Sequence, residues 1–229
     1  MMSTTSNKSI AVLVSGGLDS CILVSVLLAQ GRVVQPLYIR SHLVWESAEL
    51  PALRRYLECI RTPGLHGLVT LELPLVDLYG KHWSVTGQAT PGGDEPDEAV
   101  FLPGRNALLT IKACLWCQLH GVPELALGNL GTSPFADAKP AFCEQMQSIL
   151  GCDGQPPIRI VLPFSGCNKR RVMELGRQQS LELTFSCLAP VGEIHCGRCN
   201  KCAERRAAFH VIGRADPTRY ATQSPPDLS

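Results

Sequence analysis

Short runs of apolar residues alternate along most of this chain with longer stretches that have helical character. The short runs are rich in Val, Ile and Leu and predict buried strands, because a strand covered on both faces needs apolar side chains throughout. The expected strands span residues 10–14, 33–39, 68–73, 124–127 and 159–162. The expected helices span residues 21–29, 46–60, 107–120, 140–150 and 169–178.

Strands that alternate with helices predict a mostly parallel sheet with helices on both faces. We therefore expect one doubly wound α/β domain over residues 1–180, and an apolar content of 45% is enough to build its core. Residues 84–99 are rich in Gly and Pro and are expected to form a loop. Residues 181–215 follow as an extension of the same domain. Residues 216–229 are rich in Pro, Thr and Ser, and we expect a tail that is disordered at its end.

A glycine-rich turn, Ser-Gly-Gly-Leu-Asp-Ser at residues 15–20, joins the first expected strand to the first expected helix. The N–H groups at the start of a helix lack partners and the helix dipole is positive there, so such a turn is an anion site. Gly16 and Gly17 let the backbone wrap a phosphate closely. Asp19 is expected to hold Mg²⁺ or to cap the helix.

The alternative for this turn is an ordinary strand-to-helix connection in which the glycines only allow tight bending. The turn is not a Walker A loop, because no Gly-Lys-Ser/Thr follows, and it is not the dinucleotide fingerprint, because its glycines are adjacent. It does match Ser-Gly-Gly-x-Asp-Ser, the signature of the ATP pyrophosphatases known as PP-loop enzymes.

Composition narrows the classes of partner and compartment. A formal net charge of +1 argues against electrostatic capture of nucleic acid, which needs a strongly basic surface. Residues 1–9 are polar, and the first apolar run is too short for a signal peptide or a membrane span. We therefore expect a cytoplasmic protein, in which the eleven cysteines are thiols or metal ligands rather than disulfides.

Four cysteines near the C-terminus form the strongest metal signal. Cys187 is followed by Cys196, Cys199 and Cys202, with eight, two and two residues between them. Short turns of this kind bring thiolates onto one tetrahedral ion, and four sulfurs leave no open coordination position. We therefore expect a structural Zn²⁺ site of four sulfurs. The neighbouring His195 is an alternative for one ligand, and four unrelated thiols are the alternative for the whole group.

A second pair, Cys114 and Cys117, lies almost one turn apart within the helix expected at residues 107–120. Free cysteine packs as a small hydrophobe, so we interpret this pair as core thiols. The alternative is an iron–sulfur or thiol-transfer site, because some tRNA-thiolating PP-loop enzymes carry such a pair in a helix.

Two further segments are expected beside the glycine-rich turn, since open α/β sheets bind ligands at the carboxyl ends of their strands. Tyr38 lies at the end of the second expected strand. The segment Phe-Leu-Pro-Gly-Arg-Asn, residues 101–106, opens the helix at residues 107–120. There Arg105 can pair with a phosphate, and Asn106 can cap the helix.

Four blocks of sequence together resemble the 7-cyano-7-deazaguanine synthase family of PP-loop ATP pyrophosphatases, the nitrile-forming enzymes of queuosine-precursor synthesis. The blocks are residues 15–20, residues 101–106, residues 137–142, and the cysteine segment 185–202 with Arg205 and Phe209. Their order and spacing cover nearly the whole expected domain. The resemblance implies an adenine nucleotide alpha-hydrolase-like fold with a zinc-bound helical C-terminal extension.

The resemblance also implies a reaction. Family members convert 7-carboxy-7-deazaguanine, ammonia and ATP into the nitrile: ATP adenylates the carboxylate and releases pyrophosphate, ammonia gives the amide, and a second activation dehydrates it. ATP, Mg²⁺ and Zn²⁺ are the implied cofactors, and a homodimer is the implied assembly. The implied catalytic residues are Ser15, Asp19 and Ser20. The residues implied to bind the nucleotide and its Mg²⁺ are Ser15, Gly16, Gly17, Leu18, Asp19, Ser20, Tyr38, Arg105 and Asn106.

The chain departs from the family in the loop expected to hold the substrate. Family members carry Pro-Asp-Cys-Arg-Pro-Glu-Phe, whereas residues 136–142 read Ala-Asp-Ala-Lys-Pro-Ala-Phe. Asp137 keeps a family position and Lys139 replaces an arginine, so both are expected to bind the substrate. Two other functions stay open: a tRNA-thiolating enzyme that uses Cys114 and Cys117, and a catalytically inactive zinc-containing protein that binds a partner.

Overall fold

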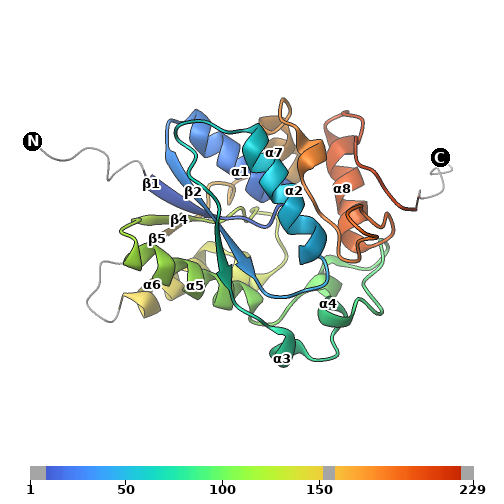
Figure 1. Ribbon diagram of the computed structural model, residues 1–229, viewed down its shortest axis with the longest axis horizontal. Coiled ribbons are helices and arrows are strands. Elements are labelled where there is room, and N and C mark those ends of the chain that lie inside the picture. Colours follow the sequence, from blue (N-terminus) through green and yellow to red (C-terminus); the bar gives the residue numbers. More distant parts are fainter. Residues whose placement is uncertain (1–8, 152–157, 223–229) are drawn as a thin grey trace, which may run out of the picture.

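The computed structural model describes residues 9–151 and 158–222 and contains a five-stranded sheet (Figure 1). Its strand order is β3-β2-β1-β4-β5, and every neighbouring pair is parallel. The expected doubly wound α/β class is therefore confirmed, and each predicted strand is found within one residue at either end. The strands β1 to β5 span Ser9–Leu13, Val33–Arg40, Val69–Glu72, Glu124–Ala126 and Arg159–Val161.

Helices cover both faces of the sheet (Figure 1). The helices α1 (Leu18–Ala29), α2 (Glu46–Cys59) and α7 (Lys169–Leu175) lie on one face. The helices α5 (Arg105–Leu119) and α6 (Pro140–Leu150) lie on the other. Residues at or just after the carboxyl ends of β1, β2 and β4 line a cavity between the two layers.

The central strand β1 is buried from both sides, which explains its unbroken apolar run. Ile10 and Val12 pack into the core beneath α1, together with Leu23. Ala11 points the opposite way and packs with Leu125 into the core beneath α5 and α6. Side chains alternate between the two faces of a strand, so a central strand needs apolar residues at consecutive positions.

Three helix boundaries differ from the sequence prediction by two residues or more. The helix expected from residue 107 begins at Arg105. The first helix begins at Leu18 rather than at residue 21, because Gly17 acts as its N-cap. As a result, the second half of the glycine-rich turn forms the first turn of α1. The helix predicted to reach residue 178 ends at Leu175, just before Gly176, a residue with low helix propensity. Shorter helical segments are α3 (Val76–Tyr79), η2 (Ala136–Ala138) and η3 (Leu181–Leu183).

The region expected to be a loop, residues 84–99, is more structured than predicted. It begins within the short helix α4 (Trp83–Thr86) and ends in a 3₁₀ turn, η1 (Asp97–Val100). Its middle is attached to the C-terminal segment, because the Gly93 N–H donates to the Arg198 carbonyl at 2.9 Å. The loop therefore packs against the cysteine-rich segment, a long-range contact that local composition does not reveal.

The C-terminal helix α8 (Asn200–Val211) is joined to the rest of the domain by a buried arginine. Arg205 is 1% exposed. Its guanidinium donates to Thr184 Oγ1 at 2.8 Å, to the Leu181 carbonyl at 2.8 Å and to Thr218 Oγ1 at 2.6 Å. The first part of the predicted tail thus contacts α8, while residues 223–229, where we expected disorder, lie outside the described residues.

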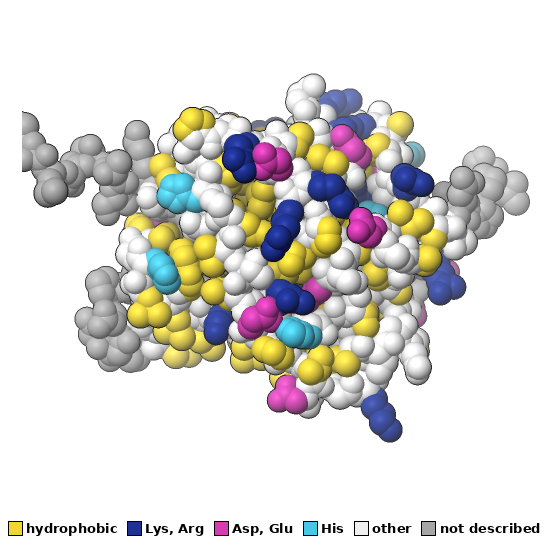
Figure 2. Space-filling model, in the orientation of Figure 1, with side chains coloured by type: hydrophobic (Ala, Val, Ile, Leu, Met, Phe, Trp, Pro, Cys, Tyr) yellow, Lys and Arg dark blue, Asp and Glu magenta, His cyan; other side chains and the backbone are white. Residues whose placement is uncertain are grey.

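The face shown in Figure 2 carries lysine, arginine and acidic side chains interspersed with apolar ones rather than a field of one sign. This mixture agrees with the formal net charge of +1. None of the helices in the described ranges combines the length and the apolar character that crossing a bilayer requires.

Candidate active site and metal centre

The Ser-Gly-Gly-Leu-Asp-Ser loop lies at the carboxyl end of β1. This strand pairs with β2 on one side and with β4 on the other, so the loop occupies the point where the strand order reverses. Ligands of doubly wound sheets bind at such switch points. Gly16 has a φ of 74°, a conformation that other residues rarely adopt, and Gly17 caps α1. The loop therefore presents the N-terminus of α1 to the carboxyl edge of the sheet.

The two serines hold this loop in shape. The Ser15 N–H donates to Ser20 Oγ at 3.2 Å, and the two hydroxyl oxygens are 3.3 Å apart. The Gly17 N–H lies 3.4 Å from Ser15 Oγ. Both serines also line a cavity of about 340 Å³ that opens beside the loop. Their hydroxyls are thus preorganised where a ligand would lie.

Asp19 does not cap the helix, so that part of the prediction is wrong. It is the second residue of α1, and both carboxylate oxygens accept from Lys169 Nζ, at 2.9 and 2.8 Å. Burial raises the pKa of Asp19 above its ordinary value, although Lys169 opposes this effect. The glycine-rich turn, which has no lysine of its own, acquires one from α7.

A chain of alternating charges continues from Lys169 into α8. Lys169 Nζ also lies 3.0 Å from Glu204, and Lys201 Nζ contacts the other oxygen of Glu204 at 2.6 Å. Burial works against the charged forms, but the two lysines lower the pKa of Glu204 to about 2. Asp19 and Glu204 in turn raise the pKa of Lys169. Lys169 and Lys201 both line the cavity beside the glycine-rich turn.

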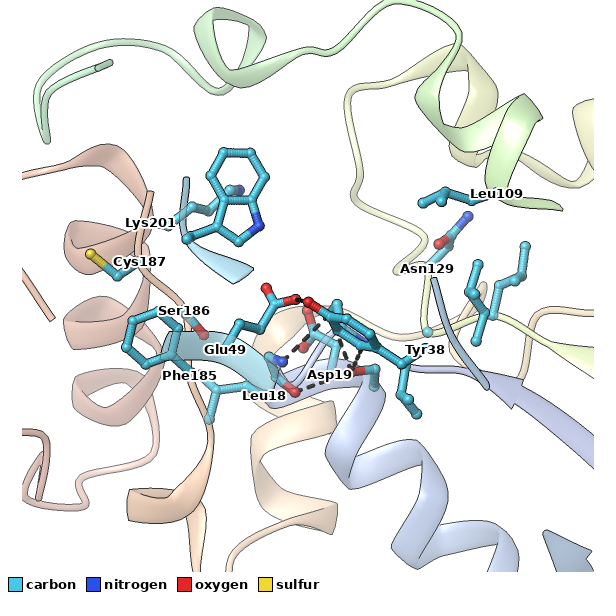
Figure 3. Close-up of a pocket in the computed structure, with 18 of the residues that line it drawn as sticks. Leu18, Asp19, Tyr38, Glu49, Leu109, Asn129, Phe185, Ser186, Cys187 and Lys201 are labelled. Carbon is cyan, nitrogen blue, oxygen red and sulfur yellow. Dashed lines mark hydrogen bonds between the residues drawn. The ribbon is translucent and has the colours of Figure 1, made fainter. Parts of the chain in front are cut away.

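Tyr38 and Glu49 meet inside the same cavity. The Tyr38 hydroxyl donates to Glu49 Oε1 at 2.9 Å, and in Figure 3 the two side chains point toward each other. Glu49 is only 8% exposed. Its burial raises its pKa to about 8, against the opposing influence of Arg105 and of the Tyr38 hydrogen bond. A carboxyl group that titrates near neutrality thus lies in the cavity.

Arg105 and Asn106 come from the start of α5 on the opposite layer. Asn106 is the second residue of this helix and Gly104 is its N-cap, so the predicted capping role of Asn106 is wrong. Both residues line the first cavity and also an adjoining one of about 570 Å³. Of the residues expected to bind the nucleotide, all except Gly16 line the first cavity: Ser15, Gly17, Leu18, Asp19, Ser20, Tyr38, Arg105 and Asn106.

The two residues expected to bind the substrate are placed differently. In the described part of the chain, neither Asp137 nor Lys139 is among the residues that line the two cavities. Lys139 Nζ donates to the Gly131 carbonyl at 3.2 Å, within its own loop. Asp137 Oδ1 is buried without a hydrogen-bond partner. The neighbouring Phe135 does line the second cavity and stacks on Phe101, with ring centroids 5.6 Å apart.

The four C-terminal cysteines converge as predicted. Their sulfurs all lie within 4.8 Å of one another, and all four side chains are buried. The Cys196–Cys202, Cys187–Cys199 and Cys199–Cys202 sulfur pairs are separated by 3.8, 3.9 and 3.5 Å. A tetrahedron with Zn–S bonds of about 2.3 Å has edges of about 3.8 Å. The sulfurs therefore fit a single zinc ion.

Backbone N–H groups surround these sulfurs, an arrangement that favours thiolates over thiols. The N–H groups of Leu188 and Gly197 approach Cys199 Sγ and Cys202 Sγ, each at 3.4 Å. A side chain at Gly197, whose φ is 85°, would collide with the Thr222 carbonyl. His195 takes no part, because its Nε2 accepts from the Ser186 N–H at 3.0 Å. The expected ligand set of four sulfurs is thus favoured over the set that includes His195.

Cys114 and Cys117 are core thiols, as we predicted. Both are 0% exposed and pack in the apolar core between the sheet and α5. Burial raises the pKa of each thiol to about 12, which keeps it protonated and unreactive at neutral pH. In the described part of the chain, neither cysteine lines the two cavities beside the glycine-rich turn.

Sequence reasoning missed four charged residues of the site: Lys169, Lys201, Glu204 and Glu49. Lys169 could have been suspected, because it starts a helix after the last strand and follows Asn168, which caps that helix. Lys201 and Glu204 were hidden inside a segment that we interpreted only as a metal site. Glu49 resembles any acidic residue in the first turn of a helix, and only its burial distinguishes it.

The fold and the site define a PP-loop α/β protein with a four-cysteine centre at its C-terminal end. The chain belongs to the family of the queuosine biosynthesis protein QueC, whose family model matches residues 9–213. The family resemblance inferred from the four sequence blocks is thereby confirmed.

Two curated relatives agree with this assignment. A 7-cyano-7-deazaguanine synthase of Solidesulfovibrio magneticus is 31% identical over 96% of this chain and 98% of its own length. One of Sulfolobus acidocaldarius is 28% identical over 96% of this chain, which spans only 49% of that relative. Among solved structures, a 4-thiouridine synthetase–RNA complex with bound ATP has a TM-score of 0.49 at 16% identity, covering 90% of this chain and 50% of that one.

Proposed function

We propose that this protein uses ATP to convert 7-carboxy-7-deazaguanine and ammonia into 7-cyano-7-deazaguanine. One observation carries the proposal: a single cavity is lined by the glycine-rich turn from one layer of the fold and by Arg105 and Asn106 from the other. The sequence resemblance implies that these two blocks bind the nucleotide. Membership of the QueC family and the named relatives support the same reaction.

The pyrophosphate part of ATP binds at the glycine-rich turn in this proposal. The N-terminus of α1 and the hydroxyls of Ser15 and Ser20 supply hydrogen-bond donors. Lys169 and Lys201 supply positive charge, and Asp19 holds Mg²⁺ after it releases Lys169. Neutralising the leaving pyrophosphate is the main electrostatic task of an adenylating enzyme, since a carboxylate must be given a good leaving group before ammonia can attack it.

The deazaguanine acid binds in the adjoining cavity of about 570 Å³. The Phe101 and Phe135 rings offer flat apolar surfaces for a fused aromatic base. We retain Asp137 as the acceptor for the N–H groups of the base, because its buried oxygen has no partner. This role requires the loop to shift when the base binds, since Asp137 lines neither cavity in this structure. The contact of Lys139 with the Gly131 carbonyl supports a role in holding the loop instead.

The four cysteines hold zinc as a structural ion in this proposal, because four sulfurs close its coordination shell. They lie next to the first cavity, which is lined by Cys187, Ser186 and Lys201. Lys201 lies between Cys199 and Cys202 in the sequence. The centre therefore anchors the start of α8, which supplies both Lys201 and Glu204. The resemblance adds a homodimer as the proposed assembly.

A tRNA-thiolating function is less well supported. It would need reactive thiols near the nucleotide, whereas Cys114 and Cys117 are fully buried in the core with raised pKa values. An inactive zinc-containing module is also less well supported, because the charged residues around the glycine-rich turn are complete and mutually oriented.

A coupled assay tests the proposal. The protein is incubated with 7-carboxy-7-deazaguanine, ammonium, ATP and Mg²⁺, and the products are read by mass spectrometry, with ATP–pyrophosphate exchange measured in parallel. We expect acid-dependent exchange and formation of the nitrile. Accumulation of the amide alone would mean that the second step is lost. Absence of both products and of acid-stimulated exchange would refute the deazaguanine acid as the substrate.

A further inference from the structure

The first cavity contains one carboxyl group that the proposed handling of ATP leaves without a role. The acidic side chains in its described lining are Asp19, Glu49 and Glu204. Asp19 and Glu204 are paired with lysines at 2.8 and 3.0 Å. Glu49 instead accepts a hydrogen bond from a neutral hydroxyl, that of Tyr38, at 2.9 Å. A carboxyl group placed like this in an anion-binding cavity repels phosphate when it is ionised, so its presence calls for a different ligand.

The position of Glu49 ties it to the reacting end of the nucleotide. It lies in the first turn of α2, and a Cβ atom built on Gly16 would lie 3.1 Å from Glu49 Cγ. Glu49 therefore packs directly on the glycine-rich turn. Arg105, which lines both cavities, is close enough to influence its charge. Glu49 thus lies near the junction where the nucleotide and the acid would meet.

We propose that Glu49 binds the ammonium ion and accepts a proton from it, so that ammonia is generated next to the activated acid. This inference rests on the proposed function, because it assigns the nitrogen donor's binding site in that reaction. Tyr38 completes the site: its hydroxyl donates to Glu49 and offers an oxygen lone pair to an N–H of the ammonium.

The physical reason is that ammonium has no lone pair and cannot attack an acyl group. At neutral pH most of the ammonia in solution is protonated to ammonium. The enzyme therefore needs a base that removes one proton from it. Burial disfavours an ammonium–carboxylate pair relative to neutral ammonia beside a neutral carboxylic acid. The pKa of Glu49, raised by burial to about 8, makes this group a far better proton acceptor than an ordinary glutamate.

Ammonium transfers one proton to the Glu49 carboxylate and becomes ammonia. The nitrogen lone pair forms a C–N bond to the acyl carbon, and the C–O bond to the AMP phosphate breaks, so its electron pair leaves with AMP. The surplus proton on nitrogen departs with the AMP phosphate or to water, and Glu49 returns its own proton to solvent before the next turnover.

The charges around Glu49 determine how this step depends on pH. Tyr38 from β2, Arg105 from α5, Glu46 on the same helix and Cys21 on α1 are its ionisable neighbours. Tyr38 and Cys21 stay neutral, because burial raises the pKa of each group above its ordinary value. Ammonia-dependent turnover is therefore expected to fall below a pH of about 8, as Glu49 becomes protonated.

The variant Glu49→Gln tests the inference, because glutamine keeps the shape and the hydrogen bond from Tyr38 but cannot take a proton. At a pH of about 7.5 we expect ammonia-dependent product formation to fall about 100-fold, the usual contribution of a general base. ATP–pyrophosphate exchange that depends on the deazaguanine acid should stay within about twofold of the wild-type rate. Hydroxylamine, which is neutral at this pH, should restore product formation as the hydroxamate.

Glu58→Gln is the matched control, since Glu58 lies on the same helix, on the surface, and pairs with Arg61. It should change none of these rates. In Tyr38→Phe, the pH below which ammonia-dependent turnover falls should be higher than in the wild type. The reason is that the hydroxyl no longer stabilises the Glu49 carboxylate.

The outcomes separate two kinds of failure. If Glu49→Gln loses exchange and ammonia-dependent turnover equally, Glu49 positions the nucleotide and the inference is wrong. An unchanged ammonia-dependent rate would refute it as well, and so would loss of the hydroxylamine reaction. If the wild type itself shows no acid-dependent exchange, the proposed function fails and the inference fails with it.

Discussion

Replacing Lys169 with methionine tests whether the charges gathered around the glycine-rich turn bind phosphate. The substitution keeps the length of the side chain but removes the ammonium that bonds Asp19 at 2.8 and 2.9 Å and Glu204 at 3.0 Å. Removing one partner of a buried pair costs about 3–5 kcal/mol. The Lys169 and Asp19 side chains are each 24% exposed, so we expect the lower end of that range, about 3 kcal/mol.

This loss of stability has a measurable size and a defined sign with pH. For a chain of this length, about 3 kcal/mol lowers the Tm by roughly 6–12 °C. Without Lys169, the pKa of Asp19, already raised by burial, rises further. A carboxyl group whose pKa is raised on folding contributes stability at low pH that is lost as the pH increases. The deficit in Tm should therefore be smaller at a pH of about 5 than at about 8.

The same variant should bind pyrophosphate more weakly. A hydrogen bond from a charged group contributes about 1.5–3 kcal/mol, which corresponds to a loss of about 10- to 150-fold in affinity. Calorimetric titration with Mg²⁺ and pyrophosphate measures it. Arg170→Met is the control, because Arg170 is the next residue of α7 and is exposed. If Lys169→Met lowers the Tm but binds pyrophosphate like the wild type, then Lys169 has only a structural role.

Two further predictions concern the metal and the nucleotide. Elemental analysis should find about one zinc per chain, as expected for a single closed site. Cys199→Ser should lose the metal and lower the Tm, because metal binding there is coupled to folding. Cys114→Ser should keep the metal. Bound iron that depends on Cys114 would contradict the assignment of Cys114 and Cys117 as core thiols. Asp19→Ala and Ser15→Ala should each reduce acid-dependent ATP cleavage by about 100-fold or more while retaining the fold, as judged by circular dichroism. AMP and pyrophosphate are the expected products in the wild type, and release of ADP and phosphate instead would refute the PP-loop mechanism.

The elements of the domain were predictable because they depend on short-range patterns. Consecutive apolar residues predict both the buried strand β1 and the helix α1, and the glycine-rich turn between them has a local signature. The cysteine centre was predictable for the same reason, since two of its three spacings are only two residues long. In each case the residues that cooperate are close together in the sequence.

What only the tertiary structure decided is which distant charges come together. Lys169 and Asp19 are 150 residues apart in the chain, yet they form the central ion pair of the site. The same holds for Glu49, whose chemistry follows from burial against Gly16 and Tyr38 rather than from its neighbours in the sequence. The ionisation of such a group is determined by desolvation and by nearby charges. Both arise only when the layers of the sheet close around it, so the sequence determined the fold and the signature loop, and packing determined the electrostatics of the site.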